Sequence, residues 1–445
     1  MSKLHNGLTV AFALALALPA GSVGSAQAKP SAAQANPLAT QDQTEVTAKA
    51  LRALETEVVK QGRALAEYRW KAVLRDEPPA QAWDSFDAMM DDYMFNYAMK
   101  AANSDANYPR IAHVYTPPHT WQGMDVPGSR WGGDNPDNIY RIIPIDSKAH
   151  YRLDGKLSAN PPSNVSYTLV GNWETSKTLN GIENTQLEYG PDGSFSITLD
   201  PEPANGRPNH IQTREGSKLL FIRDSLGDWD QQANYLAIHR LDPPDAPPMT
   251  DEQIAAKAAE IAVDGVPQVY WYYKLAHGEP NVMTQLQPSG ANGGLVTQRG
   301  SSGYGVLEED EALVITMDPS DATYYSVVAH SYWWITIDYA NHTSGLNNGQ
   351  VVKNNDGTTT FVVARKDPGV HNWIDTAGQK HVVFVFRTQG LSAKPAYEPT
   401  IRSQLVKLSE LKSVLPAETK WVTPKERAAQ IGERQRQIAA RMADH

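Results

Sequence analysis

The sequence predicts a mainly β fold in which two related β-sandwich (jelly-roll-like) units are flanked by α-helices at the N-terminus, centre and C-terminus. Short alternating apolar runs, separated by Gly, Pro, Asn and Asp, fill residues 108–242 and again 312–391. This pattern is typical of antiparallel sheet. Motifs of the first stretch also recur in the second at a nearly constant spacing, which indicates that one β unit was duplicated.

The repeat depends on a few matched residues. At offsets of 163 or 164 residues, Asp192-Gly193 matches Asp356-Gly357, Asn209 matches Asn372, and Arg223 matches Arg387. Glycine adopts positive φ at little cost, so each Asp-Gly pair predicts a hairpin turn. We expect positions shared by both copies to serve the common fold, by closing turns or by holding carboxylates and carbonyls. Positions present in one copy only are freer to serve a function.

The helices are predicted from apolar spacing and capping residues. In residues 46–68 and 82–99, apolar side chains recur at the spacing of one helix face. Thr250 with Gln253 forms a capping box for a further helix that reaches about residue 263. The charged segments 403–412 and 423–442 are also predicted to be helical, with mainly solvated faces. The expected organisation is a signal peptide at 1–28, a linker and N-terminal helices at 29–107, β units at 108–242 and 312–391, a helical or irregular insert at 243–311, and a helical tail at 392–445.

The N-terminus and the composition narrow the possible locations and partners. A basic start, the apolar run VAFALALALPA and Ala26-Gln27-Ala28 predict a secretory signal peptide, and therefore a periplasmic or secreted protein. The run is shorter than the roughly 20 residues of a membrane helix, so stable membrane insertion is not expected. The 445 residues include no Cys and carry a formal charge of −10, which excludes disulfides and disfavours nucleic acid as a partner. The oligomeric state is left open.

Residues 128–138 (GSRWGGDNPDN) are a Gly-rich stretch with no close counterpart in the second copy, where the corresponding run 300–312 lacks the Arg-Trp. Its glycines allow tight turns, and Pro136 fixes the next bend. The side chains left to project are those of Arg130, Trp131, Asp134, Asn135, Asp137 and Asn138. This set, joined by Arg141 just beyond it, suits a sugar or a carboxylate ligand. In the alternative interpretation, Asp and Asn cap turns and Trp131 plugs the end of the sandwich.

Carboxylates beside tryptophans form a second group of candidates. They are Glu174 beside Trp173, Asp228 beside Trp229, and Asp338 near Trp333 and Trp334. A glycosidase needs two carboxyl groups facing each other across a cleft. Asp228 and Asp338 are therefore candidate catalytic residues, and Trp173, Glu174 and Trp333 are candidate binding residues. The alternative is that each carboxylate is solvated or forms a turn.

A third group of candidates could remove a proton beside a carboxylate, as a polysaccharide lyase does. Imidazole titrates near neutrality, so His330 or His342 could act with Tyr140 or Tyr332 and an arginine. A hydrogen-bonded structural role is the alternative for each histidine. No metal-ligand spacing, phosphate loop or nucleophile elbow is present in the sequence, so no metal and no cofactor is implied.

The segment from Asn354 to Arg387 resembles a bacterial family that carries a domain of unknown function numbered 1214. The resembling features are an Asn-Asn-Asp-Gly turn, a strand, Pro368, Asn372-Trp373, a small-residue turn and a strand ending in Arg387. The family's Asn-Trp-Leu-Pro is Asn-Trp-Ile-Asp here. The segment NPDNIYRIIPID also resembles a strand opening found in relatives. The resemblance implies an all-β core and brings no reaction with it.

Three functions remain open on these observations. Export, abundant Trp and Tyr, paired β units and acidic-aromatic clusters favour an enzyme that acts on a carbohydrate, as a hydrolase or lyase, in a cleft between the units. The second hypothesis is a non-catalytic binding protein for a glycan or an aromatic molecule. The third is an envelope protein that contacts a partner through its charged C-terminal helices.

Overall fold

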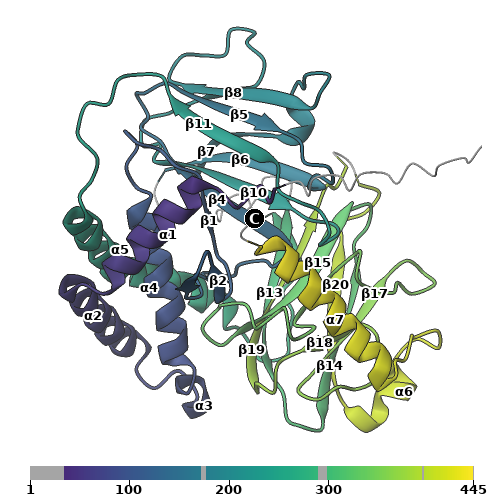
Figure 1. Cartoon of the computed structure of the whole chain (residues 1–445). Coiled ribbons are helices and arrows are strands. Elements are labelled where there is room, and N and C mark those ends of the chain that lie inside the picture. Colours follow the sequence, from purple (N-terminus) through teal and green to yellow (C-terminus); the bar gives the residue numbers. More distant parts are fainter. Residues whose placement is uncertain (1–34, 172–176, 289–297, 393–394, 444–445) are drawn as a thin grey trace, which may run out of the picture. The chain divides into compact units, whose positions relative to one another are not determined.

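Both β stretches fold into sandwiches that pair a five-stranded with a four-stranded sheet. The computed structural model describes residues 35–171, 177–288, 298–392 and 395–443, and its helices and strands lie in the unit Asn36–His445. The predicted signal peptide at 1–28 falls outside the described residues. Figure 1 shows the two sandwiches, with the helices α1, α2, α4 and α5 gathered on one side.

The first unit has the sheet orders β1-β4-β10-β6-β7 and β11-β5-β8-β9. Its strands are β1 (Ala112–Val114), β4 (Asn138–Pro144), β5 (Tyr151–Lys156), β6 (Asn164–Val170), β7 (Thr178–Glu183), β8 (Ser194–Asp200), β9 (His210–Gln212), β10 (Leu219–Ser225) and β11 (Tyr235–Arg240). Alternate residues of these strands point between the two sheets. They form a core that includes Ile143, Leu153, Tyr167, Ile197 and Ile222. A small hairpin, β2 (His119–Trp121) with β3 (Met124–Val126), precedes β4.

The second unit repeats this topology strand for strand, with the orders β12-β13-β19-β15-β16 and β20-β14-β17-β18. Its strands are β12 (Gln287–Pro288), β13 (Arg299–Val306), β14 (Glu311–Asp318), β15 (Tyr324–Ser331), β16 (Gly345–Asn347), β17 (Thr359–Ala364), β18 (Trp373–Asp375), β19 (His381–Gln389) and β20 (Thr400–Lys407). Even the parallel pair β8–β9 has its equivalent in β17–β18. The predicted duplication is therefore confirmed by the topology. The second sandwich also takes in β12, β13 and β20, which lie outside the expected range 312–391.

The matched asparagines hold the same backbone clamp in both units. Asn209 accepts a hydrogen bond from the backbone N–H of Glu188 and donates to its carbonyl, both at 2.8 Å. Asn372 does the same with Val352, at 2.9 and 2.7 Å. The predicted structural role of this pair is confirmed.

The two Asp-Gly turns have the predicted backbone but not the predicted connection. Gly193 and Gly357 have φ of +79° and +87°, and the preceding aspartate accepts a hydrogen bond from the N–H of Ser194 or Thr358. The strands on either side belong to different sheets. Each turn therefore passes the chain between sheets and does not close a hairpin, because both edges of the local strand already have other neighbours.

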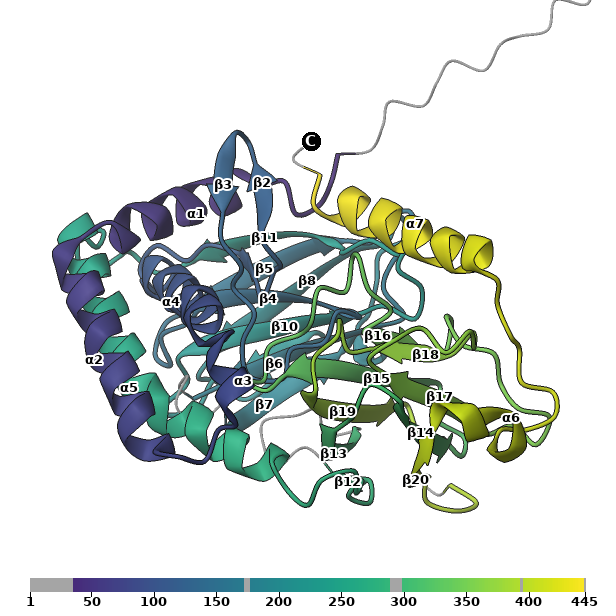
Figure 2. The same ribbon diagram turned by 90° about the horizontal axis from the view of Figure 1, so that it is seen from below.

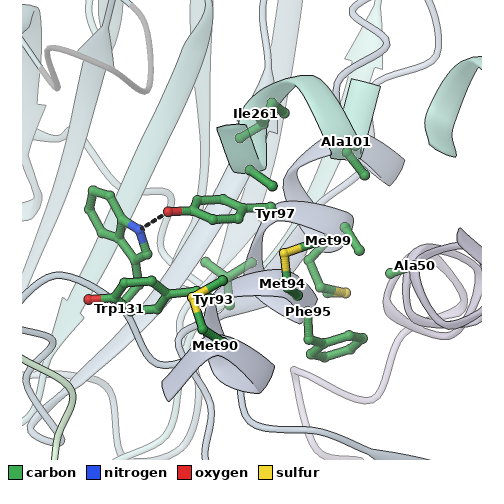
Figure 3. Close-up of a cluster of buried hydrophobic side chains, with 14 of the residues drawn as sticks. Ala50, Met90, Tyr93, Met94, Phe95, Tyr97, Met99, Ala101, Trp131 and Ile261 are labelled. Carbon is green, nitrogen blue, oxygen red and sulfur yellow. Dashed lines mark hydrogen bonds between the residues drawn. The ribbon is translucent and has the colours of Figure 1, made fainter. Parts of the chain in front are cut away.

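The N-terminal and central helices pack together beside the first unit (Figure 2). They are α1 (Gln41–Leu54), α2 (Glu57–Leu74), α3 (Ala80–Trp83), α4 (Phe86–Ala102) and α5 (Asp251–Ala276). The single helix predicted at 46–68 is two helices, and α5 continues past residue 263 through Pro267. The predicted capping box of Thr250 and Gln253 is present. Almost every residue of α4 is buried, and Figure 3 shows its tyrosines and methionines in this core together with Trp131 and Ile261.

The C-terminal segment contains the helix predicted at 423–442, but residues predicted as a helix at 403–412 lie largely in a strand. Residues 400–407 form the edge strand β20, paired with β14, since Ile401 and Val406 are buried against the sandwich. The short α6 (Leu411–Val414) and α7 (Pro424–Arg441) follow. Three arginines of α7 at seven-residue spacing contact the two units: Arg427 lies over Trp373, Arg434 lies over Trp229, and Arg441 donates to the carbonyl of Pro136. No helix in the described parts of the chain combines the length and apolarity of a membrane span.

Candidate functional site

A cavity of about 480 Å³ lies where the outer faces of the two five-stranded sheets meet α5 and the loop 128–138. We name it the seam cavity. The first unit lines it with Tyr140 of β4 and Phe221 and Arg223 of β10, and the second unit with Gly300 of β13 and Val385 and Arg387 of β19. Its volume is in the range of small-molecule sites, about 300–1,000 Å³. The sequence analysis expected a site between the two β units, and this is the cavity found there.

The loop 128–138 forms one wall of the seam cavity and locks the two units together. Gly132 and Gly133 have φ of +55° and +77°, a backbone that side-chain-bearing residues rarely adopt. The N–H of Gly133 donates to the carbonyl of Trp334 at 3.0 Å, and Arg387 donates to the carbonyl of Gly133. A Cβ on Gly128 would lie 2.0 Å from Oδ1 of Asp92, so this first glycine is required by a close approach to α4.

An ion pair and a network of hydrogen bonds hold this loop in place. Arg130 forms a two-pronged pair with the buried Asp92 of α4, at 3.0 and 2.6 Å, and donates to the carbonyl of Thr336 at 2.9 Å. The carboxylate of Asp134 accepts hydrogen bonds from the N–H and the hydroxyl of Thr336, at 3.1 and 2.6 Å. His330 is fully buried and contacts the carbonyl of Asp134 at 2.8 Å. The loop is thus bonded to the second unit along much of its length.

Aromatic side chains make up most of the apolar lining. Besides Phe386, whose side chain belongs to the core of the second sandwich, they are Tyr115, Trp131, Tyr140, Phe221, Tyr272 and Trp334. Tyr115 stacks on Trp131 with an interplanar angle of 10°, and meets Tyr140 edge to face with ring centroids 4.9 Å apart. Tyr115 and Trp334 also have positive φ, 63° and 62°. Such strained backbone tends to occur at binding and catalytic sites.

Two arginines and an indole supply the polar side of the cavity. Arg223 and Arg387 occupy equivalent positions of β10 and β19, and burial together with the nearby charge of Arg387 lowers the pKa of Arg223. Nη1 of Arg387 and Nε1 of Trp334 are buried and have no hydrogen-bond partner among the described residues. Both side chains are at most 8% exposed. Buried donors that lack a protein acceptor call for an explanation, and a bound acceptor would satisfy both.

Asp134 is the one acidic residue among the described residues that line the cavity, and its carboxyl group titrates in an unusual range. Burial raises its pKa from 3.8 to about 6, although Thr336 and Arg130 act in the opposite direction. A pKa that is higher in the folded than in the unfolded state favours folding below pH 3.8 and loses that contribution as the pH rises through 6.

We therefore expect the advantage of the wild type over Asp134→Asn in the free energy of unfolding to fall by about 2.4 kcal/mol between pH 4 and pH 7. Urea unfolding of both proteins across this range measures the difference, and the subtraction removes the titration of all other groups. A difference that stays constant with pH would contradict the raised pKa.

Comparison with known proteins identifies part of this architecture. Residues 306–392 match the family described as "Protein of unknown function (DUF1214)". This segment is a DUF1214-type module. It includes β14 to β19 and brings Trp334, Val385, Phe386 and Arg387 to the seam cavity. The rest of the cavity comes from residues outside the DUF1214-type module.

One solved structure shows that the fold extends beyond the DUF1214-type module. A crystal structure of an uncharacterized protein from Burkholderia cenocepacia is similar over 81% of this chain and 100% of its own, with 23% identity and a TM-score of 0.68. The VPA0106 protein from Vibrio parahaemolyticus matches 72% of this chain and 99% of its own, with 11% identity and a TM-score of 0.41. A comparison with curated proteins found no match.

The structure brings only some of the predicted site residues to the seam cavity. Trp131, Asp134 and Tyr140 line it. Arg130 is engaged by Asp92, and Trp333 of the DUF1214-type module donates its indole N–H to the carbonyl of Ala82 at 2.7 Å. These two hold the walls of the cavity in position. Trp173 and Glu174 lie outside the described residues.

The other predicted residues lie elsewhere and have structural partners. Arg141 lies on the opposite face of β4 from Tyr140 and forms a buried two-pronged pair with Asp224. Asp137 accepts three hydrogen bonds in the interior. Asp228 and Asp338 are exposed and accept backbone N–H groups of their own turns, as the alternative interpretation expected. Burial lowers the pKa of His330 to about 3, so it is neutral at pH 7.

The sequence analysis missed the two arginines as binding residues because it assigned repeated positions to the fold. The repeated arginine was nevertheless visible in the sequence and could have pointed to the site. Equivalent residues on the outer faces of two packed units converge where those faces meet, so a charged residue repeated in both copies marks their seam. Among the described residues, no group of three or more His, Asp and Glu is placed to hold a metal ion.

Proposed function

We propose that the seam cavity binds a small organic anion that carries a ring, such as an acidic sugar or an aromatic carboxylate. The observation that carries the proposal is the convergence of Arg223 and Arg387, one from each unit, on a single cavity. The acidic residue of the described lining, Asp134, already has both oxygens hydrogen-bonded to Thr336. Guanidinium groups bind carboxylates through paired, charge-assisted hydrogen bonds.

The rest of the lining fits a ring better than a bare inorganic ion. Six aromatic side chains provide faces on which a ring can stack. Gln285, Gln298 and Ser302 also line the cavity, and amide and hydroxyl groups can both donate to and accept from sugar hydroxyls. The signal-like N-terminus supports export, and we include in the proposal that the ligand is met in the periplasm or outside the cell.

Binding without catalysis is the function that this geometry supports best. Asp228 and Asp338, the candidate glycosidase pair, are absent from the described lining of the cavity. Burial raises the pKa of Tyr140, so its phenol stays protonated at neutral pH. Its oxygen already accepts hydrogen bonds from the N–H of Asn135 and the side-chain amide of Asn138, which does not suit a lyase base. The arginines of α7, which the partner-binding hypothesis requires at the surface, are largely used in contacts within the chain.

Matched pairs of ligands test the proposal. Isothermal titration of the chain would compare phenylacetate with phenylacetamide, and a galacturonate trimer with its methyl ester. We expect the anion of at least one pair to bind and its neutral counterpart not to bind. Loss of a charged hydrogen bond costs about 1.5–3 kcal/mol, so Arg387→Gln and Arg223→Gln should each weaken binding by about tenfold or more.

The control is Arg402→Gln, because Arg402 is exposed on β20 and is not among the described residues that line the cavity. It should leave the affinity unchanged. No binding by any of the four compounds, or equal binding of anion and neutral counterpart, would contradict the proposal. New reducing ends or an unsaturated product from the galacturonate trimer would show catalysis and favour the enzyme hypothesis instead.

A further inference from the structure

The duplicated sheets carry different side chains beside their equivalent arginines. In the first unit, Arg223 of β10 lies directly opposite Tyr140 of β4. In the second unit, Arg387 of β19 lies directly opposite Gly300 of β13. On their other side, the two arginines face Ser166 and Ser326 in the same register. The two surroundings are thus equivalent in backbone, and a tyrosine in one corresponds to a glycine in the other.

Two further positions show the same reduction in size. Two residues before each arginine on its strand, on the same face, stand Phe221 and Val385. On the neighbouring strand, Val114 of β1 pairs with Tyr140, and the next residue is Tyr115. In the second unit, Gln287 of β12 pairs with Gly300, and the next residue is Pro288. Tyr115 and Pro288 are therefore equivalent. Three aromatic rings of the first unit therefore correspond to proline, glycine and valine in the second.

In the first unit the three rings fill the space beside the arginine. Phe221 stacks on Tyr140 with ring centroids 5.7 Å apart, and Tyr115 meets both rings edge to face. The guanidinium carbon of Arg223 lies 4.1 Å from the centre of the Phe221 ring. An arginine over an aromatic face gains a cation–π attraction. In the first unit, aromatic side chains of the same unit therefore pack beside Arg223.

The second unit leaves the equivalent space to the cavity. Gly300, Val385 and Pro288 all line the seam cavity, and none of them has an aromatic ring to place beside Arg387. Val385 packs on one side against the cluster of Ala276, Trp334 and Val383. Nη1 of Arg387 and Nε1 of Trp334 lack partners on this side among the described residues. The space next to them is the space that aromatic side chains occupy in the first unit.

We propose that the ring of the bound anion lies over Gly300 and Val385 of the second unit, with its acidic group on Arg387, and so takes the place of the aromatic cluster found in the first unit. This rests on the proposed function, and it adds where the ligand lies, which arginine holds its charge and that one ligand binds per chain. Gly300 and Val385 then set the size of the ring that fits.

Filling the space with the side chains of the first unit tests this placement. Gly300 lies within a strand and has no positive φ, so its backbone accepts a side chain. Titrations with phenylacetate and with the galacturonate trimer would compare the wild type with Gly300→Tyr and, as an independent variant, Val385→Phe. We expect one site per chain in the wild type and at least tenfold weaker binding in each variant. Thr400→Tyr adds the same ring at an exposed position of β20 and should bind as the wild type does.

The possible outcomes separate the two proposals. If the wild type binds either probe and both filling variants bind it equally well while keeping the wild-type melting temperature, the ring does not lie over the second unit and this placement is wrong. Two sites per chain would also overturn it. If the wild type binds neither probe, the proposed function itself fails. If one filling variant does not fold, the other decides the result.

Discussion

Asp224→Ala will lower the free energy of unfolding by about 3–5 kcal/mol, because it leaves the guanidinium of Arg141 buried without a counter-charge. Asp224 is 0% and Arg141 2% exposed, and their two hydrogen bonds measure 3.0 and 2.8 Å. Arg141 also donates to the carbonyl of Asn234 at 2.7 Å, so it is fixed in the interior and cannot turn to water. Urea unfolding at pH 7 measures the loss.

The matched control is Asp230→Ala, which removes an ion pair with Arg436 in which both side chains are about half exposed. Exposed pairs contribute about 0–1 kcal/mol. The double variant Arg141→Met, Asp224→Leu removes both buried charges, and we expect it to be less destabilised than Asp224→Ala alone. Equal losses in the buried and the exposed variant would show that the Arg141–Asp224 pair is not sealed from water.

The second large effect is expected for Asp137, whose carboxylate joins the two sandwiches. It accepts hydrogen bonds from Trp229 of the first unit at 2.7 Å, and from Asn347 and Tyr324 of the second at 3.0 and 2.7 Å. Asp137→Ala leaves the buried indole N–H of Trp229 without its acceptor, at a cost of about 1–3 kcal/mol. It also removes the charged acceptor of Tyr324 and Asn347, whose remaining acceptors are Oγ of Ser326 at 2.8 Å and the carbonyl of Leu226 at 3.5 Å. We expect a total loss of about 3–5 kcal/mol in the free energy of unfolding.

Because these bonds link the units, the same variant should also reduce the cooperativity of unfolding. In scanning calorimetry the ratio of calorimetric to van't Hoff enthalpy should rise above that of the wild type. Asp228→Ala, which removes an exposed carboxylate of the first unit, should change the stability by no more than about 0.5 kcal/mol. An Asp137→Ala protein with wild-type stability and an unchanged enthalpy ratio would show that the units are coupled by other contacts.

The fold was predictable where local pattern and tertiary structure agree. The matched Asn209 and Asn372 and the Asp-Gly turns identified the duplication, and the strand order of the two units confirms it. The sequence pattern failed to predict strands whose pairing with a neighbouring strand outweighs their low intrinsic strand propensity. The run 299–306 is rich in Gly and Ser, which are poor strand formers, yet it forms β13 because β19 pairs along its whole length. Likewise, the exposed face of β20 is polar, and in the sequence this pattern resembles the solvated face of a helix.

The candidate site was predictable in location but not in membership. A seam between the units was expected, and of the candidate residues named from the sequence, Trp131, Asp134 and Tyr140 line the cavity. Asp137 has the same side chain as Asp134, and Arg141 the same as the lining arginines, yet Asp137 and Arg141 point into the interior. Which way each side chain points depends on strand register and on loop contacts such as the bond from Arg387 to the carbonyl of Gly133, and neither can be read from composition or spacing.

The pairing of Tyr140 with Arg223, and of Gly300 with Arg387, has a consequence for how a duplicated protein can evolve. A homodimer encoded by one gene must present identical residues on both halves of its two-fold interface, so any widening on one half is repeated on the other. Fusion of both copies in one polypeptide removes that constraint. One unit can then keep its aromatic side chains while small residues in the other leave space for a ligand. An asymmetric ligand can therefore bind without having to match a two-fold symmetric site.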